Sequence, residues 1–348
     1  MSDDGNKPLF GVARSFTGKS WRQRSGDDRL GLAVAQRLEL PEIVGRLLVT
    51  RGVALDDADD FLEPKLARLL PDPAHLKDMD AAVTRLVRAV ETGERVAVFG
   101  DYDVDGATSA ALLTRYFRCL GMELDIYIPD RLAEGYGPNA PALQGLARAG
   151  VSVVITVDCG ITAFEPLAAA KASGLDVVVV DHHLAEPRLP EAAAVINPNR
   201  LDDDSECKQL AAVGVAFLLV VGLNRALRDA GLFSPVRPEP DLRQWLDLVA
   251  LGTVADVVPL TGVNRAFVIA GLKVLARRAN AGLAALADVA GIDEAPGTFH
   301  LGFILGPRVN AGGRVGDAAL GARLLATDDA IEAMRLAARL DGYNWERR

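Results

Sequence analysis

The chain has 348 residues, half of them apolar, and a formal net charge of −9 at pH 7. It has no secretory signal pattern and no apolar run of the roughly 18 residues that a membrane span needs, so we expect a globular, cytoplasmic protein of two or three domains without a membrane partner. The acidic balance excludes a uniformly basic nucleic-acid binder but not DNA binding, because bound cations would offset the carboxylates of a metal centre.

The first part of the chain divides into two predicted regions. Residues 1–28 lack sustained apolar periodicity, which predicts a flexible tail. Residues 29–94 carry apolar side chains at helical spacing, and Pro64, Pro71 and Pro73 interrupt them. Proline lacks the amide donor of a helix interior, so we expect a small region of short helices here.

A regular alternation of short apolar runs and longer helical patterns begins at Arg95. We predict strands at 95–99, 124–128, 152–157, 176–180 and 193–196, with helices at 106–120, 139–149 and 162–173. This order predicts an α/β fold with a doubly wound, mostly parallel sheet that helices cover on both faces. Ligands of such sheets bind beyond the carboxyl ends of the strands. The residues that directly follow each strand are therefore the first candidates for a site.

The rest of the chain is predicted to be helical apart from one Gly-rich stretch. We expect helices at 208–230, 241–256 and 264–278, the Gly-rich stretch at 302–316, and a final helix from Ala318 with few breaks. On this basis an α/β domain covers 95–262. A helical and Gly-rich segment, 263–348, follows it and ends in the start of a connecting helix.

Three aspartates follow the first predicted strand. Asp101, Asp103 and Asp105 alternate along the chain, and Gly106 permits a turn that a Cβ atom would obstruct. The carboxylates of Asp103 and Asp105 are thereby able to turn toward a pair of metal ions. Their hard oxygen atoms suit magnesium or manganese. The alternative is an ordinary surface turn or helix cap.

Further metal-ligand types end other apolar runs. Asp158 follows the third predicted strand, Asp181-His182-His183 follows the fourth, and Asp256 ends the apolar run near residue 255. Imidazole among carboxylates favours manganese. We expect one histidine to bind metal and its neighbour to face a substrate phosphate, with Asp181 setting protonation and tautomer. Each residue alone is explained as a cap, but together they supply ligands for two divalent cations.

Two cations held close together indicate a particular chemistry. They bridge a phosphoryl oxygen, deprotonate a water molecule and neutralise charge in the transition state, so the sequence predicts phosphoester hydrolysis. The chain has no Walker-type phosphate loop, which argues against nucleoside triphosphate hydrolysis. It also has no Gly-x-Ser-x-Gly elbow, which argues against a serine hydrolase.

Two segments carry side chains suited to a nucleic-acid strand. Arg131, after the second predicted strand, is placed to meet a backbone phosphate, and Tyr136 is placed to stack on a base unless it packs locally. Arg308, Asn310 and Arg314 combine two cations and an amide in the Gly-rich stretch. We interpret that stretch as a phosphate or sugar clamp with a flexible backbone. The alternative is a loop whose arginines contact solvent.

Taken in order, these motifs resemble those of the DHH phosphoesterase superfamily and, within it, the RecJ single-strand-specific DNA exonucleases. The resemblance rests on residues 98–109, 156–160, 181–183, 252–260 and 306–314. It extends from about Leu30 to the last residue. It implies a metal-dependent 5′-to-3′ exonuclease that hydrolyses the phosphodiester bonds of single-stranded DNA in repair and recombination. The partners it implies are single-stranded DNA, a single-strand-binding protein and a helicase.

The resemblance also implies a ligand set for two ions, Mn²⁺ or Mg²⁺. The implied ligands are Asp103, Asp105, Asp158, His182 and Asp256. Asp158 would bridge the two ions. Asp101, Asp181 and His183 are assigned to catalysis, with His183 touching the scissile phosphate and Asp101 acting as a ligand or as a neighbour of the ligands.

On the substrate side, the resemblance implies that Arg131 meets a phosphate near the 5′ end, beside Tyr136. Arg308, Asn310 and Arg314 would approach the strand from the side opposite the metals. RecJ-like proteins continue into a DHH-associated domain and an oligonucleotide-binding barrel, and neither occurs in this sequence. We therefore expect a truncated chain with reduced DNA affinity. Two alternatives stay open: a phosphodiesterase for short oligonucleotides or cyclic dinucleotides, and an inactive replication scaffold.

Overall fold

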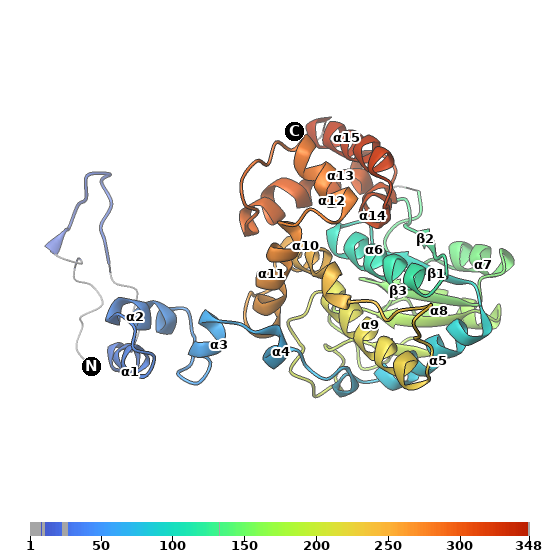
Figure 1. Ribbon diagram of the computed structural model, residues 1–348, viewed down its shortest axis with the longest axis horizontal. Helices are drawn as coiled ribbons and strands as arrows, with labels where there is room; N and C mark the ends of the chain where they lie inside the picture. Colours follow the sequence, from blue (N-terminus) through green and yellow to red (C-terminus); the bar gives the residue numbers. More distant parts are fainter. Residues whose placement is uncertain (1–7, 9–10, 23–26, 132, 347–348) are drawn as a thin grey trace. The chain divides into compact units, whose positions relative to one another are not determined.

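The computed structural model describes residues 8, 11–22, 27–131 and 133–346 (Figure 1). The chain forms two compact units, residues 1–69 and 70–348. Much of the tail predicted at 1–28 lies outside the described residues. Its described part from 11 to 22 includes turns and bends but no α-helix or strand.

The first unit is a small helical assembly, as predicted for this part of the chain. Its helices are α1 (Asp28–Arg37), α2 (Glu42–Thr50), α3 (Ala58–Leu62) and α4 (Leu66–Leu69). Val34, Leu48, Val53 and Ala58 form its buried core. The first two helices cross very closely, because a Cβ atom on Gly45 would lie 2.1 Å from the backbone oxygen of Gly31.

The second unit is built on a five-stranded sheet in which every pair of neighbours is parallel. Its strands are β1 (Val96–Gly100), β2 (Asp125–Tyr127), β3 (Val153–Val157), β4 (Asp176–Val180) and β5 (Ala194–Ile196), in the order β2-β1-β3-β4-β5. The α/β fold class is therefore confirmed. The strand order reverses between β1 and β3, which is where ligands bind in open sheets of this kind.

Helices cover both faces of the sheet. The apolar cluster on one face joins α7 (Ala140–Arg148) and α8 (Phe164–Ala172) to strand residues that include Phe99 and Val179. On the other face, α5 (Met79–Thr92) contacts β5, α6 (Val104–Cys119) contacts β1, and α9 (Ala212–Asp229) contacts β3 and β4. Because β1 and β3 are buried on both faces, their sequences are almost entirely apolar, with Thr156 as the polar exception.

The contacts group the chain into units that meet at residue 70, and the domain boundaries after residues 94 and 262 stay predictions. Helix α5 belongs to the second unit, because it packs on α9 and β5 rather than on the helices before residue 70. A short 3₁₀ helix, η3 (Pro73–His75), precedes it. At the other end, α10 (Leu246–Ala255) contacts both α6 and α11 (Gly262–Leu275), so contacts continue across residue 262.

The C-terminal part differs from the prediction in three places. The Gly-rich stretch is helical: a π-helix, η5 (His300–Leu305), runs directly into α13 (Gly306–Val315). The predicted last helix is two helices, α14 (Leu320–Ala326) and α15 (Ala330–Glu346). Helix α12 (Ala281–Val289) was not predicted, and a 3₁₀ turn, η4 (Leu242–Trp245), precedes α10.

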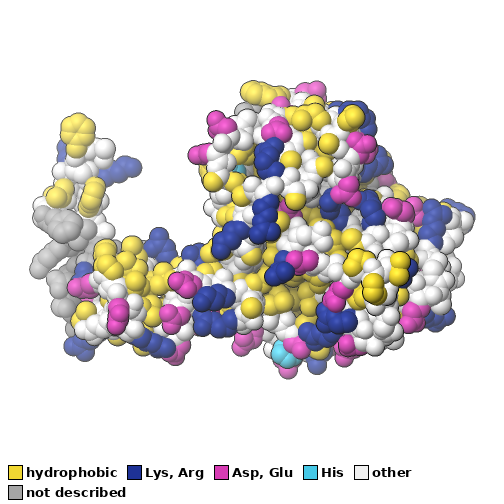
Figure 2. All heavy atoms as spheres, in the orientation of Figure 1, with side chains coloured by type: hydrophobic (Ala, Val, Ile, Leu, Met, Phe, Trp, Pro, Cys, Tyr) yellow, Lys and Arg dark blue, Asp and Glu magenta, His cyan; other side chains and the backbone are white. Residues whose placement is uncertain are grey.

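The face shown in Figure 2 is mixed in charge. On the face in Figure 2, Lys and Arg side chains alternate with Asp and Glu rather than forming one broad basic area. Within the described ranges, no helix combines the length and the apolar character needed to cross a bilayer.

Candidate metal centre

Three neighbouring strands each end directly before an aspartate. The register pairs Gly100 with Val157 and Val157 with Val180, so the residues that follow, Asp101, Asp158 and Asp181, are level across the sheet. Each of the three continues the sheet by one backbone hydrogen bond, donating its N–H to the next strand at 3.0–3.2 Å. The fold itself thus gathers three buried carboxyl groups at the point where the strand order reverses.

The loop from β1 into α6 adds two more carboxylates. Asp103 is the N-cap of α6 and accepts hydrogen bonds from the N–H groups of Asp105 and Gly106. Asp105 is fully buried, and its two oxygens accept the N–H groups of Ala212 and Val213 at the start of α9, at 2.6 and 2.9 Å. The turn requires glycine at 106, where a Cβ atom would lie 2.4 Å from the Asp101 backbone oxygen.

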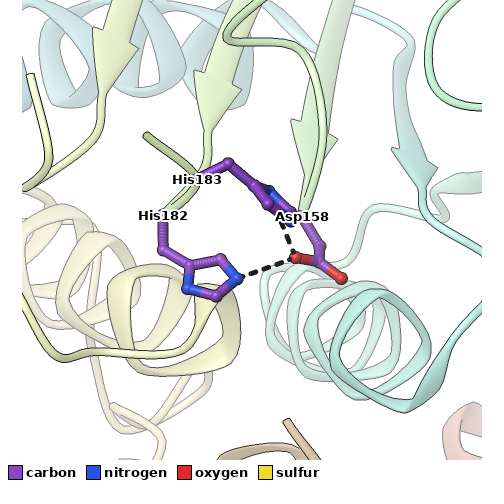
Figure 3. Close-up of side chains that lie close together, drawn as sticks. All are labelled: Asp158, His182 and His183. Atoms are coloured by element: carbon purple, nitrogen blue, oxygen red, sulfur yellow. Dashed lines mark ion pairs between the residues drawn. The ribbon is translucent and has the colours of Figure 1, made fainter. Parts of the chain in front are cut away.

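Asp158 lies at the middle of the group and has a strained backbone. Its φ of 60° is in the left-handed region, which an aspartate tolerates better than most residues. Its Oδ1 atom lies 3.2 Å from His182 Nε2 and 4.0 Å from His183 Nδ1 (Figure 3). Oδ1 is buried and has no hydrogen-bond donor among the described residues.

Asp181 is fully engaged in orienting the turn after β4. Its carboxylate accepts the N–H groups of Ile161, His182 and His183, at 2.7–3.1 Å, and lies 2.8 Å from His183 Nδ1. Although burial raises the pKa of Asp181, its contacts with His183 and these N–H groups lower it overall. The lowered pKa favours the ionised carboxylate, which lies in hydrogen-bond contact with the His183 ring.

The pKa values of the two histidines shift in opposite directions. Burial lowers the pKa of His182, which favours the neutral imidazole, and its Nε2 atom faces the carboxylates of Asp105, Asp158 and Asp256. The hydrogen bond to Asp181 raises the pKa of His183 and occupies its Nδ1, which leaves Nε2 as the proton donor. Two residues that we did not predict fix this turn: Asn197 donates to the His183 backbone oxygen and Asn199 to that of His182.

Asp256 completes the group from a helix rather than from a strand. It is the C-cap of α10, and its Oδ2 lies 3.7 Å from His182 Nε2, which in turn lies 3.8 Å from Asp105 Oδ2. The next residue, Val257, has a φ of 63°, a strained value for a β-branched side chain. Strain of this kind persists only where the surrounding structure holds it.

These side chains form three overlapping sets of ligand-type atoms, each within 4.8 Å. The sets are Asp158, His182 and His183; Asp105, His182 and Asp256; and Asp101, Asp103 and Asp158. Because Asp181 already occupies Nδ1 of His183, we set aside the set that contains His183 and favour the other two sets as the cation sites. The five predicted ligands thus converge, with Asp101 beside them.

The electrostatics fit the binding of cations. Burial and then the Asp103 carboxylate raise the pKa of Asp101 to about 7, and burial and Asp103 raise that of Asp256 to about 6. The pKa values of Asp105 and Asp158 also rise, through burial and then neighbouring carboxylates. Buried Asp101 Oδ1, Asp158 Oδ1 and His182 Nε2 have no hydrogen-bond partners in the described part of the chain. Such a donor-poor acidic pocket fits divalent cations.

The predicted substrate residues differ in their accessibility. Arg131 is exposed, with its guanidinium over the Tyr102 ring at 5.1 Å. Tyr136 is 55% exposed, which leaves its ring open to a base, and its hydroxyl donates to the Asp158 backbone oxygen at 3.2 Å. Both residues border the acidic pocket.

Helix α13 carries the other three, and they are not equivalent. Arg314 is exposed and Asn310 is partly buried. Arg308 is buried, pairs with Asp341 at 2.8 Å and donates to the Ile304 backbone oxygen, so its charge is already used inside the protein. The expected flexible backbone is wrong here, because the stretch is helical and a Cβ atom on Gly313 would lie 2.7 Å from the Tyr102 backbone oxygen.

The part of the sequence that forms the sheet and most of these acidic residues matches a known protein family. Residues 95–253 match the sequence model of the DHH family, N-terminal domain. Residues 95–253 form a DHH-family N-terminal domain. The match covers all five strands and most of the acidic residues, and it ends three residues before Asp256.

Several proteins that are similar in sequence to this chain are RecJ proteins. It is 40% identical over 332 residues to the single-stranded-DNA-specific exonuclease RecJ of Salmonella typhimurium, covering 94% of this chain and 56% of the relative. It is 38% identical to that of Bacillus subtilis, covering 93% and 40%. The chain thus spans about half the length of these relatives.

Two crystal structures of RecJ proteins share the fold. Exonuclease RecJ bound to manganese superposes with a TM-score of 0.70 at 37% identity, covering 78% of this chain and 66% of that one. RecJ in complex with Mn²⁺ from Thermus thermophilus gives a TM-score of 0.76 at 33% identity, covering 92% and 44%.

Proposed function

We propose that this chain carries the metal-dependent catalytic centre of a 5′-to-3′ exonuclease for single-stranded DNA, acting in DNA repair and recombination. The observation that carries the proposal is the convergence of Asp103, Asp105, Asp158, His182 and Asp256 on one buried pocket with unpartnered ligand atoms. The relatives are named for this activity, and two solved RecJ structures contain manganese.

The five converging residues would hold two ions, Mn²⁺ or Mg²⁺, with Asp158 shared between them. Bound ions supply positive charge that activates a water molecule and offsets the charge of the phosphoryl group. His183 is half-exposed and oriented by Asp181, so its Nε2–H donates to a non-bridging oxygen of the scissile phosphate. Asp101 lies beside the ligands, where its carboxyl group can take part in holding an ion or a water molecule.

The substrate strand would be bound by the exposed groups around the pocket. Arg131 is proposed to bind a phosphate near the 5′ end and Tyr136 to stack on a base. Asn310 and Arg314 are proposed to approach the strand from α13. Arg308 is proposed to act indirectly, by tying α13 to α15 through Asp341.

The test uses this chain with manganese and 5′-labelled DNA. Single strands should be degraded to mononucleotides from the 5′ end, and duplex DNA of the same sequence should stay intact. Asp158→Asn is the matched inactive control. Release of mononucleotides from the 3′ end, or equal activity with duplex DNA, would contradict the proposal.

A substrate series distinguishes the other candidates. A phosphodiesterase for small substrates would prefer dinucleotides or a cyclic dinucleotide to a long strand. A scaffold would bind no stoichiometric manganese in titration calorimetry, which the complete ligand set argues against. A single-strand-binding protein and a helicase are proposed partners, because an enzyme for single strands depends on other proteins to open and present DNA. The cytoplasm is the proposed location.

A further inference from the structure

The loop after β2 connects the rim of the acidic pocket to the edge of the sheet. It covers residues 130–139, of which 132 is outside the described set. It carries both Arg131 and Tyr136, and the Tyr136 ring meets those of Tyr102 and His183 edge-on at 6.4 Å. Gly135 and Gly137 have φ values of 86° and 72°, which favour glycine, and without a Cβ atom these two residues restrict the backbone less than other residues would. Contacts with other residues must therefore fix the conformation of this loop.

Glu134 holds it at both ends. Its Oε1 accepts the N–H of Asp130 at 2.9 Å, and its own N–H donates to the Asp130 backbone oxygen at 2.7 Å. Its Oε2 accepts the Tyr127 hydroxyl at 2.6 Å and the Asn139 side-chain amide at 3.1 Å. One carboxylate therefore joins the first residue of the loop, the last residue and strand β2.

The partners of Glu134 belong to rigid elements. The Tyr127 ring stacks on the buried Phe99 ring of β1 at 5.0 Å. Asn139 is the N-cap of α7 and accepts the Ala142 N–H at 2.9 Å. Partial burial raises the pKa of Glu134, but its hydrogen bonds lower it overall, while burial and then Glu134 raise the pKa of Tyr127 to about 12. Both groups are thus in the required protonation state at neutral pH.

We propose that Glu134 is a positioning residue that fixes the loop so that Arg131 lies over Tyr102, ready to bind a phosphate near the 5′ end. This inference rests on the proposed function. Glu134 itself contacts neither the proposed metal ligands nor the place of the substrate. Its loss should therefore weaken substrate binding through Arg131 and leave the binding of manganese unchanged.

The kinetic test compares Glu134→Ala with Arg131→Ala and with the double variant. We expect each single variant to raise KM for single-stranded DNA about tenfold, with little change in kcat or in the Kd for Mn²⁺. The double variant should be no worse than Arg131→Ala alone, because Glu134 acts through Arg131. Glu91→Ala, which removes an exposed carboxylate from α5, is the matched control and should leave KM unchanged.

Hydrogen exchange of the loop provides a test that does not need nuclease activity. In Glu134→Ala the amides of residues 130–139 should exchange faster than in the wild type and in Glu91→Ala, while β1 and β3 stay protected. Glu134→Gln, which keeps one acceptor oxygen, should fall between the two.

The outcomes separate the inference from the proposed function. If the wild type does not cleave single strands, the proposed function fails, and unchanged loop exchange would still overturn the role of Glu134. Additive KM effects in the double variant would also overturn it. A melting temperature that falls together with loss of Mn²⁺ binding would show a general structural role instead.

Discussion

Strands β3 and β4 are neighbours, and both end in a buried aspartate, yet the two carboxylates have opposite surroundings. Asp181 has three backbone N–H donors and His183 around it. Asp158, level with it across the sheet, has an Oδ1 atom with no donor in the described structure and faces other acids. The protein supplies donors to both oxygens of Asp181, whereas it leaves Oδ1 of Asp158 without a donor in the described residues.

The difference shows that residue type and position do not fix a role. Both aspartates follow a buried strand and continue the sheet by one hydrogen bond. What separates them is the number of donors that the local backbone offers. At these two strand ends, the carboxylate with donors to both oxygens contacts a neighbouring histidine, while the other keeps an unpartnered oxygen.

Replacing Asp158 should have the largest effect. Asp158→Asn keeps the size of the side chain but removes the charge that two ions would share. We expect turnover to fall by about a thousandfold or more and one manganese site to be lost in calorimetry. Without metal the variant should melt higher than the wild type, because like-charge repulsion is relieved. Retained turnover would refute the bridging role.

Replacing Asp181 should give a smaller loss of a different kind. Asp181→Ala frees the His183 ring, so kcat should fall roughly 10–100-fold while the manganese stoichiometry stays the same. His183→Ala should have a similar effect, and the double variant should add little to it. If Asp181→Ala lost a manganese site, Asp181 would itself be a metal ligand, and the proposed difference between Asp158 and Asp181 would be wrong.

Gly313 in α13 packs against the backbone of Tyr102, just after the end of β1. Gly313→Ala places a methyl group 2.7 Å from the Tyr102 backbone oxygen, between Asp101 and Asp103. We expect a destabilisation of about 1–3 kcal/mol in chemical unfolding and weaker manganese binding. Gly342→Ala in α15 is the matched control: its Cβ meets nothing within 4 Å, and it should be neutral or slightly stabilising.

The smallest expected effect is a pH dependence of the metal-free protein. Asp101, at about 7, has its pKa raised well above the ordinary 3.8, so the folded state binds the proton more tightly than the unfolded state. This contribution is present at low pH and is lost as pH rises from about 4 to 7. With chelator, the melting temperature of the wild type should decrease over this range more than that of Asp101→Asn. Equal slopes would contradict the raised pKa.

The fold and the gathering of the acids were predictable because both follow from strand ends. Continuous apolar runs alternating with helical patterns predict a parallel sheet, and the sheet brings Asp101, Asp158 and Asp181 to one edge. Asp256 was predicted as one of the acids at the ends of apolar runs, although a helix supplies it.

Other features depend on contacts that a linear pattern does not contain. The Gly-rich stretch was expected to be flexible, but its glycines allow α13 to approach the Tyr102 backbone. Arg308 was expected at the substrate, and the ion pair with Asp341 from α15 is visible only in the fold. Asn197 and Asn199 had no signal beyond their place after the last strand.

The N-terminus of α9 places positive potential beside the acidic pocket. The first amides of this 18-residue helix bind both oxygens of Asp105, and the positive end of the helix dipole points at the acids. A permanent partial counter-charge is therefore part of the scaffold. It offsets part of the mutual repulsion of these buried carboxylates, so the fold does not rely on an ion alone to balance them.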